Sequence, residues 1–167
     1  MTHPLSRSRR ELLATVPFGL AALWMLSVPS APAFGARINK TPAEWLRALG
    51  PARFRILREA GTEPPFSSPL NREHRPGTFA CAGCQLPLFS SSTKFDSGTG
   101  WPSFYRPLNG SVSTKADHSF GMERTEILCA RCDGHLGHVF PDGPRPTGLR
   151  YCMNGLALAF EPGRTAA

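Results

Sequence analysis

The sequence predicts a mainly β domain of antiparallel strands with two short helices at its N-terminal end. Three observations support this fold class. The 167 residues include 16 glycines and 17 prolines, above average usage, which favours many turns and little long helix. After residue 76, short apolar or alternating runs stand between turn residues. The same part of the chain contains two Cys-x-x-Cys sequences, which are typical of tight turns that fix two strands.

Residues 1–36 have the pattern of an export signal, and we assign the folded domain to residues 37–167. A serine precedes Arg9 and Arg10 and apolar residues follow them, which is the order found in twin-arginine signals. The weakly apolar stretch at residues 12–28 leads to the small-residue sequence PSAPAFGA, where cleavage can occur. We expect a periplasmic or otherwise exported protein without stable membrane insertion after cleavage. An uncleaved signal that anchors the protein in the membrane is the alternative, although that stretch is marginal for a bilayer about 30 Å thick.

The charge of the chain is moderately basic. There are 19 lysines and arginines against 12 acidic residues, which gives a formal net charge of +7. This balance permits anionic partners without requiring them. The basic residues are scattered and form no long run, so we expect no nucleic-acid partner.

Two short helices are expected at the start of the domain. Residues 41–44 form a capping box, with threonine at the N-cap, proline at N1 and glutamate at N3. The first helix should run to Leu49 and stop at Gly50. Pro51 can start the second helix, which we expect to end at Gly61.

Strands are expected from there to the end of the chain. Residues 61–76 are rich in proline and other turn formers and should be extended. The apolar or alternating runs that follow predict strands at residues 78–81, 88–90, 126–129, 138–140, 149–153 and 156–160.

Four paired cysteines predict a structural metal site. Cys81 and Cys84 form one CxxC pair, and Cys129 and Cys132 form the other. Two such turns supply four thiolates, which is a closed tetrahedral zinc site of one ion per chain. The pairs are 44 residues apart, so the metal would connect two distant pairs of strands. Iron fits the same ligands, and disulfides are the main rival in an exported protein. Haem attachment is excluded because neither pair is followed by histidine.

Cys152 is the one cysteine outside these pairs. A thiol attacks as the thiolate, and a free cysteine is mostly protonated at neutral pH unless a nearby histidine or arginine favours the thiolate. His138 lies upstream on an expected neighbouring strand, and Arg150 and Asn154 flank Cys152 at i−2 and i+2, on one face of a strand. From residue type alone, a buried inert cysteine is the more common outcome.

Three longer segments resemble the sequences of a known protein family. KFDSGTGWPSF (Lys94–Phe104), RCDGHLGHVFPDGP (Arg131–Pro144) and GLRYCMN (Gly148–Asn154) look like signature segments of the type B methionine sulfoxide reductases, which act on methionine-R-sulfoxide. With the CxxC turns, the likeness covers roughly residues 41–162. It implies a β-rich, tent-like fold of two antiparallel sheets, with a structural zinc remote from the active site.

The resemblance also implies roles for individual residues. Cys152 corresponds to the nucleophile, His138 and Asn154 to residues that assist it, and His135 to a residue that lines the site. Trp101 corresponds to the tryptophan that packs on the substrate methyl group. The expected site residues are catalytic Cys152, His138, Asn154 and His135 and substrate-binding Trp101, Arg150 and Phe140.

The expected chemistry is attack of the Cys152 thiolate on the sulfoxide sulfur, which gives methionine and a sulfenic acid. A proton for the sulfoxide oxygen would come from His138, with His135 or a water. Many members of the family carry a second, resolving cysteine where this chain has Thr99. We therefore expect oxidised proteins as substrates, and a small thiol or thioredoxin-like donor as the reductant.

Two other functions remain open at this stage. A non-catalytic zinc-ribbon-like binding module would account for the CxxC pairs and the basic charge, but not for Cys152 beside two histidines. A thiol–disulfide oxidoreductase that uses a CxxC pair would require accessible, redox-active pairs.

Overall fold

The computed structural model describes residues 36–163. The predicted export signal therefore lies, apart from its last residue, outside the described residues. Within the described range, no helix is both long enough and apolar enough to cross a membrane.

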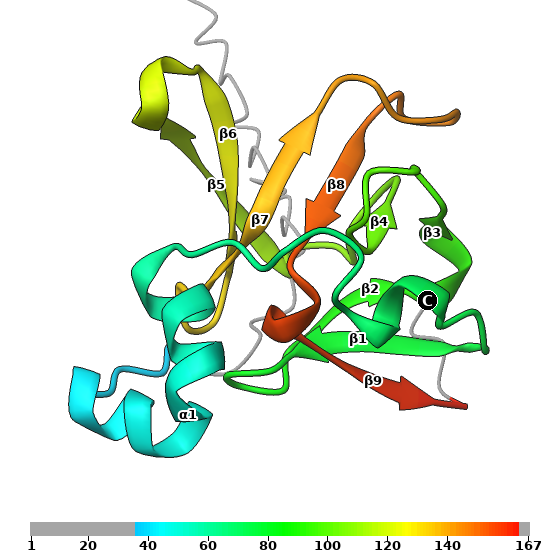
Figure 1. The fold of residues 1–167 in the computed structure, drawn as a ribbon. Coiled ribbons are helices and arrows are strands. Elements are labelled where there is room, and N and C mark those ends of the chain that lie inside the picture. Colours follow the sequence, from blue (N-terminus) through cyan, green and yellow to red (C-terminus); the bar gives the residue numbers. More distant parts are fainter. Residues whose placement is uncertain (1–35, 164–167) are drawn as a thin grey trace, which may run out of the picture.

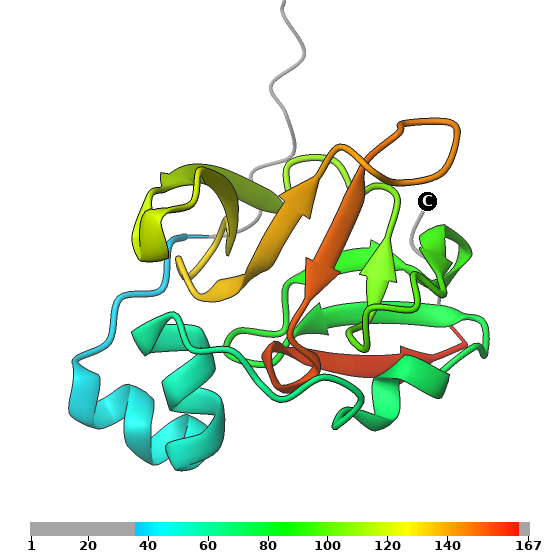
Figure 2. The same ribbon diagram turned by 45° about the horizontal axis from the view of Figure 1, so that its top comes forward.

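Two antiparallel sheets form the body of the protein (Figure 1), as predicted. The smaller sheet has the order β2-β1-β9, and the larger sheet has the order β3-β4-β8-β7-β6-β5. The strands of the smaller sheet are β1 (Gly77–Cys81), β2 (Pro87–Ser90) and β9 (Leu158–Pro162). Those of the larger sheet are β3 (Lys94–Phe95), β4 (Ser103–Phe104), β5 (Val112–Asp117), β6 (Arg124–Cys129), β7 (His135–Phe140) and β8 (Arg150–Met153). Figure 2 shows that the strands of the two sheets run across each other.

The structure has one kinked helix, α1 (Pro42–Glu59), where the sequence predicts two short ones. The predicted capping box is present at its start, and Gly50 has non-helical dihedral angles at the kink. The predicted end at Gly61 is wrong by one residue, because Ala60 takes the left-handed C-cap conformation at φ 51°. Four short 3₁₀ helices complete the described secondary structure: η1 (Pro69–Arg72), η2 (Ser91–Thr93), η3 (Ser119–Gly121) and η4 (Gly155–Ala157).

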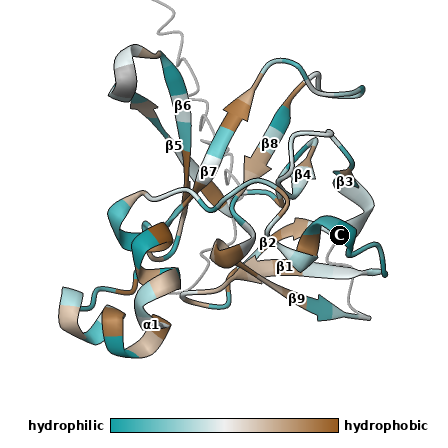
Figure 3. Cartoon of the chain, viewed as in Figure 1, coloured by the Kyte–Doolittle hydropathy of each residue, from teal (hydrophilic) through white to brown (hydrophobic). Residues whose placement is uncertain are grey.

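Most predicted strands are confirmed, and the differences have physical causes. The expected strand at residues 156–160 begins later, because the Glu63 carboxylate accepts the N–H groups of Gly155 and Leu156 and holds them in η4. Strand β5 was not predicted, since its sequence VSTKAD is polar and mostly exposed. Figure 3 shows that β6 changes from hydrophilic at its start to hydrophobic at its end.

The core lies between the two sheets. Phe79 on β1 and Phe104 on β4 meet edge to face with ring centroids 4.9 Å apart, and Phe89 on β2 stacks on Phe104 at 4.4 Å. All three side chains are fully buried. These aromatic contacts fix the larger sheet, which carries the site described next, on the smaller one.

Candidate active site and metal centre

One row of paired residues crosses the larger sheet. Ser103 of β4 pairs with Cys152 of β8, Cys152 pairs with His138 of β7, and His138 pairs with Glu126 of β6. Directly opposed residues have Cβ atoms about 5 Å apart and project to the same face. The register therefore confirms the neighbouring-strand prediction for His138 and Cys152. No hydrogen bond joins their side chains among the described residues.

A β-bulge brings the second histidine to the same face. His135 and His138 are three residues apart, an odd spacing that would place them on opposite faces of a regular strand. The register of β6 and β7 shifts by one residue at Leu136, and the two imidazole rings lie with centroids 5.5 Å apart. Gly137 allows this close packing, because a Cβ there would lie 2.1 Å from the Cys152 carbonyl oxygen.

His138 is held by a carboxylate. Its Nε2 lies 2.7 Å from Oδ2 of Asp117, which also accepts a hydrogen bond from Arg124 at 2.7 Å. Hydrogen bonds from Ser119 and then from His138 hold the pKa of Asp117 well below its usual range. The carboxylate is therefore ionised and accepts, so His138 carries a proton on Nε2 and presents Nδ1 as its other ring nitrogen.

His135 is the more buried histidine, at 3% exposure. Its Nδ1 lies 2.7 Å from Oε1 of Glu126, and its Nε2 is buried without a hydrogen-bond partner among the described residues. Burial lowers the pKa of His135, which favours the neutral ring. With Nδ1 bonded to the carboxylate, Nε2 is available to accept a hydrogen bond from a water or a ligand.

The Cys152 sulfur adjoins a chain of hydroxyl groups. Thr99 Oγ1 lies 3.8 Å from Sγ, and Ser97 Oγ bridges Thr99 at 2.8 Å and Ser103 at 2.7 Å. Burial raises the pKa of the Cys152 thiol, whereas Thr99, Arg150 and Ser103 each lower it. The resting group is therefore a half-buried thiol with donors positioned for the thiolate.

Arg150 supplies the positive charge near this thiol. Its guanidinium makes a two-point ion pair with Asp142, at 2.8 and 2.7 Å, and lies over the ring of Phe140 with 4.4 Å to the centroid. These contacts hold a cation beside Cys152 on the same strand, as the i−2 spacing predicts.

Trp101 and Asn154 are both tied to the backbone of Glu63. Trp101 Nε1 donates to the Glu63 carbonyl at 3.1 Å, and the Glu63 N–H donates to Asn154 Oδ1 at 3.0 Å. The Asn154 amide also donates to the Leu136 carbonyl at 3.3 Å. Asn154 lies just beyond the end of β8 and is 4% exposed, so these hydrogen bonds position the segments around the site. Whether it acts on substrate stays a prediction.

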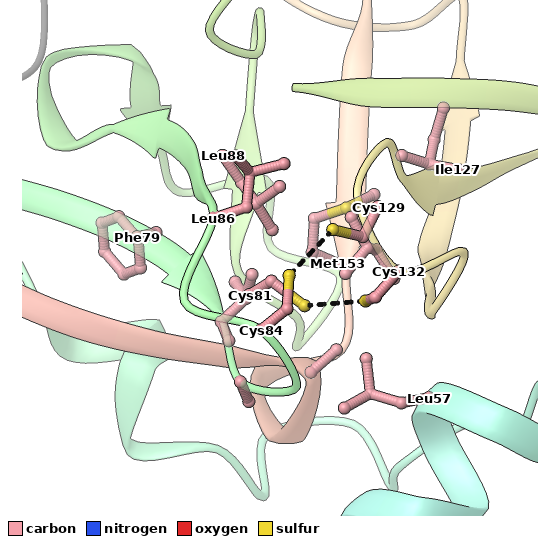
Figure 4. Close-up of a cluster of buried hydrophobic side chains, with 14 of the residues drawn as sticks. Leu57, Phe79, Cys81, Cys84, Leu86, Leu88, Ile127, Cys129, Cys132 and Met153 are labelled. Carbon is pink, nitrogen blue, oxygen red and sulfur yellow. Dashed lines mark hydrogen bonds between the residues drawn. The ribbon is translucent and has the colours of Figure 1, made fainter. Parts of the chain in front are cut away.

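The four paired cysteines form one buried cluster (Figure 4). Their sulfurs all lie within 4.8 Å of one another, with 3.7 Å between Cys81 and Cys132 and 3.5 Å between Cys84 and Cys129. All five cysteines of the chain are free thiols. A tetrahedral ion with Zn–S bonds of about 2.3 Å has S–S edges of about 3.8 Å, so the donor set fits such an ion.

The two CxxC turns are built alike. Gln85 and Asp133, each one residue after a pair, have positive φ and donate to the carbonyls of Cys81 and Cys129 at 2.8 and 2.9 Å. Cys81 ends β1 of the smaller sheet, and Cys129 ends β6 of the larger sheet. The cluster therefore joins the two sheets, as the long gap between the pairs predicts. Cys129 is three residues along β6 from the row of Cys152, which is about 10 Å of strand.

Arginines complete the surroundings of the cluster. Arg131 donates to the Cys84 carbonyl, and Arg58 of α1 donates to the Cys132 carbonyl at 2.7 Å. Figure 4 shows Leu57 of α1 beside the cysteines. The helix thus covers the cluster on one side.

Comparison with known proteins identifies the family of the chain. The SelR domain matches residues 49–162. The chain belongs to the type B methionine sulfoxide reductase family. It is similar to a protein from Pseudomonas putida named peptide methionine sulfoxide reductase MsrB, with 56% identity over 127 residues that cover 75% of this chain and 96% of the relative. A protein of the same name from Leptospira interrogans is 55% identical over 125 residues, which cover 74% of this chain and 95% of the relative. Another from Thiobacillus denitrificans is 58% identical over 124 residues, 74% of this chain and 94% of the relative.

Several residues of this reductase site were not predicted from the sequence. They are the carboxylates Asp117 and Glu126, the loop residue Glu63 and the hydroxyls of Ser97 and Ser103. The sequence gives one indication of Glu126, which is an acid within the apolar strand run TEILC. An acid on a half-buried strand needs a partner. Asp117 and Glu63 are distant in sequence from the residues that they contact, and no local pattern identifies them.

Proposed function

We propose that this protein reduces methionine-R-sulfoxide in oxidised proteins to methionine. The observation that carries the proposal is the position of Cys152, paired with His138 across two strands and 3.8 Å from the Thr99 hydroxyl, in a chain of this family. The reaction transfers one oxygen atom and two electrons, so a single cysteine is sufficient for the first step.

The Cys152 thiolate attacks the sulfoxide sulfur and forms a sulfur–sulfur bond while the oxygen gains a proton. The protonated oxygen then moves to the cysteine sulfur as the sulfur–oxygen and sulfur–sulfur bonds break. The sulfoxide is reduced to the thioether of methionine, and the cysteine is oxidised to a sulfenic acid. The Thr99 hydroxyl and the Arg150 guanidinium support this step, since both lower the pKa of Cys152 against the effect of burial.

The two histidines have different roles in this proposal. His138 supplies the proton to the sulfoxide oxygen from Nδ1 when both of its ring nitrogens are protonated, and its Nε2–H bond to Asp117 holds the ring in position. His135 is neutral and offers an acceptor at Nε2, which suits it to orient a water at the same place. Trp101 and Phe140 form the apolar wall for the S-methyl group.

The sulfenic acid is reduced from outside. Position 99 is threonine, and the four remaining cysteines are buried in their own cluster. The proposed donor is a small thiol or a thioredoxin-like protein. Two thiol groups convert the sulfenic acid to thiol and water and leave as a disulfide.

One structural zinc ion is proposed at Cys81, Cys84, Cys129 and Cys132. The four-sulfur geometry and the joining of two sheets support this assignment. The ion supplies a cross-link that stabilises the fold, since a metal bound only in the folded state adds its binding energy to folding. The burial of all four thiols disfavours a thiol–disulfide oxidoreductase that uses a CxxC pair.

Export by the twin-arginine route is proposed from the sequence alone, with residues 37–167 as the reductase domain. Replacing Arg9 and Arg10 by lysine should retain the protein in the cytoplasm as active enzyme. Arg7→Lys is the matched control and should leave export unchanged. Periplasmic recovery of the doubly substituted protein, measured by fractionation, would contradict the assignment.

The function is tested with separated epimers. Purified protein and its Cys152→Ser variant are assayed with dithiothreitol on the R and S sulfoxides of N-acetylmethionine amide. We expect turnover of the R epimer only, and none by the variant. A non-catalytic zinc-binding module would reduce neither epimer, and this outcome would overturn the proposal.

A further inference from the structure

A groove borders the proposed substrate site at Trp101. One cavity of about 190 Å³ is lined by Trp101, Lys94, Arg72 and Phe66, and a neighbouring hollow of about 430 Å³ is also lined by Phe66 and Arg72. Phe66 and Arg72 thus line both depressions. Trp101 follows two residues after Thr99, which contacts the Cys152 sulfur, so the loop that lines the groove also reaches the site.

The Phe66 segment is built tightly onto the tryptophan loop. The Phe66 N–H donates to the Gly100 carbonyl at 2.7 Å, and the Asn71 amide donates to the same oxygen at 2.8 Å. Gly100 has φ 94°, and a Cβ there would lie 2.7 Å from Pro65 and 2.8 Å from the Phe66 nitrogen. The groove and Trp101 therefore form one preformed unit.

Phe66 itself is an unusual residue for this position. The residue is 72% exposed, and its φ of 63° is a left-handed conformation that large residues rarely adopt. An aromatic side chain held in a strained conformation and open to solvent has no role in the core. Strain of this kind is typical of ligand-binding positions.

The charges along the groove are mainly positive. Arg72 is exposed and forms no ion pair among the described residues. Lys94 donates to the Asn71 carbonyl at 2.9 Å, and burial lowers its pKa. Asp96 is the one carboxylate among the residues that line the cavity, and His74 lines it too. Glu73 also acts on Lys94, but its carboxylate is paired with Arg75. Arg72 is therefore the groove cation without an acidic partner among the described residues.

We infer that this groove binds the polypeptide on either side of the oxidised methionine, and that it selects acidic neighbours. The inference rests on the proposed function and specifies its substrates. Phe66 packs on the peptide chain. Arg72 and Lys94 attract a carboxylate beside the methionine sulfoxide. A flexible protein segment whose methionine lies among aspartate and glutamate is the expected substrate class.

The test compares peptides within one enzyme preparation. Three peptides carry methionine-R-sulfoxide flanked on both sides by glutamate, by serine or by lysine, so that chain direction does not matter. Solvent-exposed charge pairs contribute about 0.2–1 kcal/mol, so kcat/KM for the glutamate peptide should exceed that for the serine peptide by a factor of roughly 1.4 to 5. The lysine peptide should be slower than the serine peptide.

Two variants locate the effect. Arg72→Glu should invert the ratio of kcat/KM for the glutamate peptide to kcat/KM for the lysine peptide. Arg47→Glu makes the same charge change on the exposed face of α1 and should leave this ratio as in the unmodified protein. Phe66→Asn keeps a residue that tolerates positive φ but removes the ring, and it should raise KM for all three peptides more than for N-acetylmethionine sulfoxide amide. A circular dichroism melt checks that each variant is folded.

The outcomes separate this inference from the proposed function. Reduction of all three peptides at equal kcat/KM, or equal changes of the ratio in Arg72→Glu and Arg47→Glu, overturns the groove alone. Absence of reduction of every R sulfoxide overturns the proposed function and the groove with it. A charge preference that Arg72→Glu reverses and Arg47→Glu does not supports both.

Discussion

The hydroxyl oxygen of Thr99 lies 3.8 Å from the sulfur of Cys152. The contact brings residue 99, where many family members carry a resolving cysteine, against Cys152. Thr99 is itself held by Ser97, which links it to Ser103 on the strand beside Cys152. Residue 99 is therefore positioned against the proposed nucleophile by a hydrogen-bonded chain.

Thr99→Cys should create an internal resolving thiol. Threonine and cysteine are similar in size, and the existing contact places the new sulfur close to Cys152. After one turnover the variant should form a disulfide between residues 99 and 152, seen by mass spectrometry of non-reduced peptides. Recycling by a thioredoxin-like donor should improve. Ser97→Cys is the matched control, since Ser97 contacts Thr99 and not the sulfur, and a disulfide formed equally well there would contradict the assigned geometry.

Thr99→Val should move the pH dependence of activity. Burial raises the pKa of Cys152, and the Thr99 hydrogen bond opposes this effect, so its loss raises the pKa further. The thiolate is the nucleophile, and kcat/KM rises with pH as the thiol ionises. The alkaline rise should therefore occur at higher pH in Thr99→Val than in the unmodified protein. Thr114→Val on exposed β5 is the control, and an unshifted profile for Thr99→Val would show that the hydroxyl does not act on the thiol.

Substitutions at His138 and Asp117 should affect catalysis to different degrees. His138→Ala should lower kcat by about 10²–10⁴-fold, the usual range for a positioned acid. Asp117→Asn should lower kcat by about 10–100-fold with little change in KM, because an amide does not stabilise an imidazolium as a carboxylate does. Glu123→Gln, an exposed acid near the start of β6, is the control. Steady-state kinetics with equal kcat for Asp117→Asn and Glu123→Gln would remove Asp117 from the mechanism.

Substitution of one cluster cysteine should weaken metal binding and lower the free energy of unfolding. Cys81→Ser should bind less than one zinc per chain and lower the free energy of unfolding by roughly several kcal/mol. Elemental analysis and urea denaturation measure the two effects. Cys152→Ser should keep its zinc and its stability, because Cys152 lies outside the cluster. Folded, active protein without any metal would refute the structural role.

Much of the fold was accessible from the sequence, because local chemistry determines it. The capping box at Thr41, the break at Gly50 and the two CxxC turns each require specific residues at fixed spacing. Strand β5 was missed because VSTKAD faces solvent and has no apolar face. The left-handed C-cap fell on Ala60, whose N–H bonds to the Arg55 carbonyl, and not on the glycine that follows.

The site was less predictable from the sequence than the fold, since its geometry depends on pairing between strands. Spacing identified the four cluster cysteines, whereas only the resemblance to the family indicated Cys152 as the expected nucleophile. The bulge at Leu136 that brings His135 to the face of His138 follows from register, which no local pattern encodes. The same holds for Asp117, whose contact with His138 requires β5 to fold beside β6.

The central claim is that Cys152 alone takes the oxygen of methionine-R-sulfoxide. The most direct test treats reduced protein, free of added thiol, with one equivalent of the R sulfoxide in the presence of dimedone, followed by peptide mass spectrometry. One dimedone adduct per chain should form at Cys152, with one equivalent of methionine released and Cys81, Cys84, Cys129 and Cys132 unmodified. A disulfide between Cys152 and one of the cluster cysteines, or methionine released without any modification of Cys152, would contradict the account.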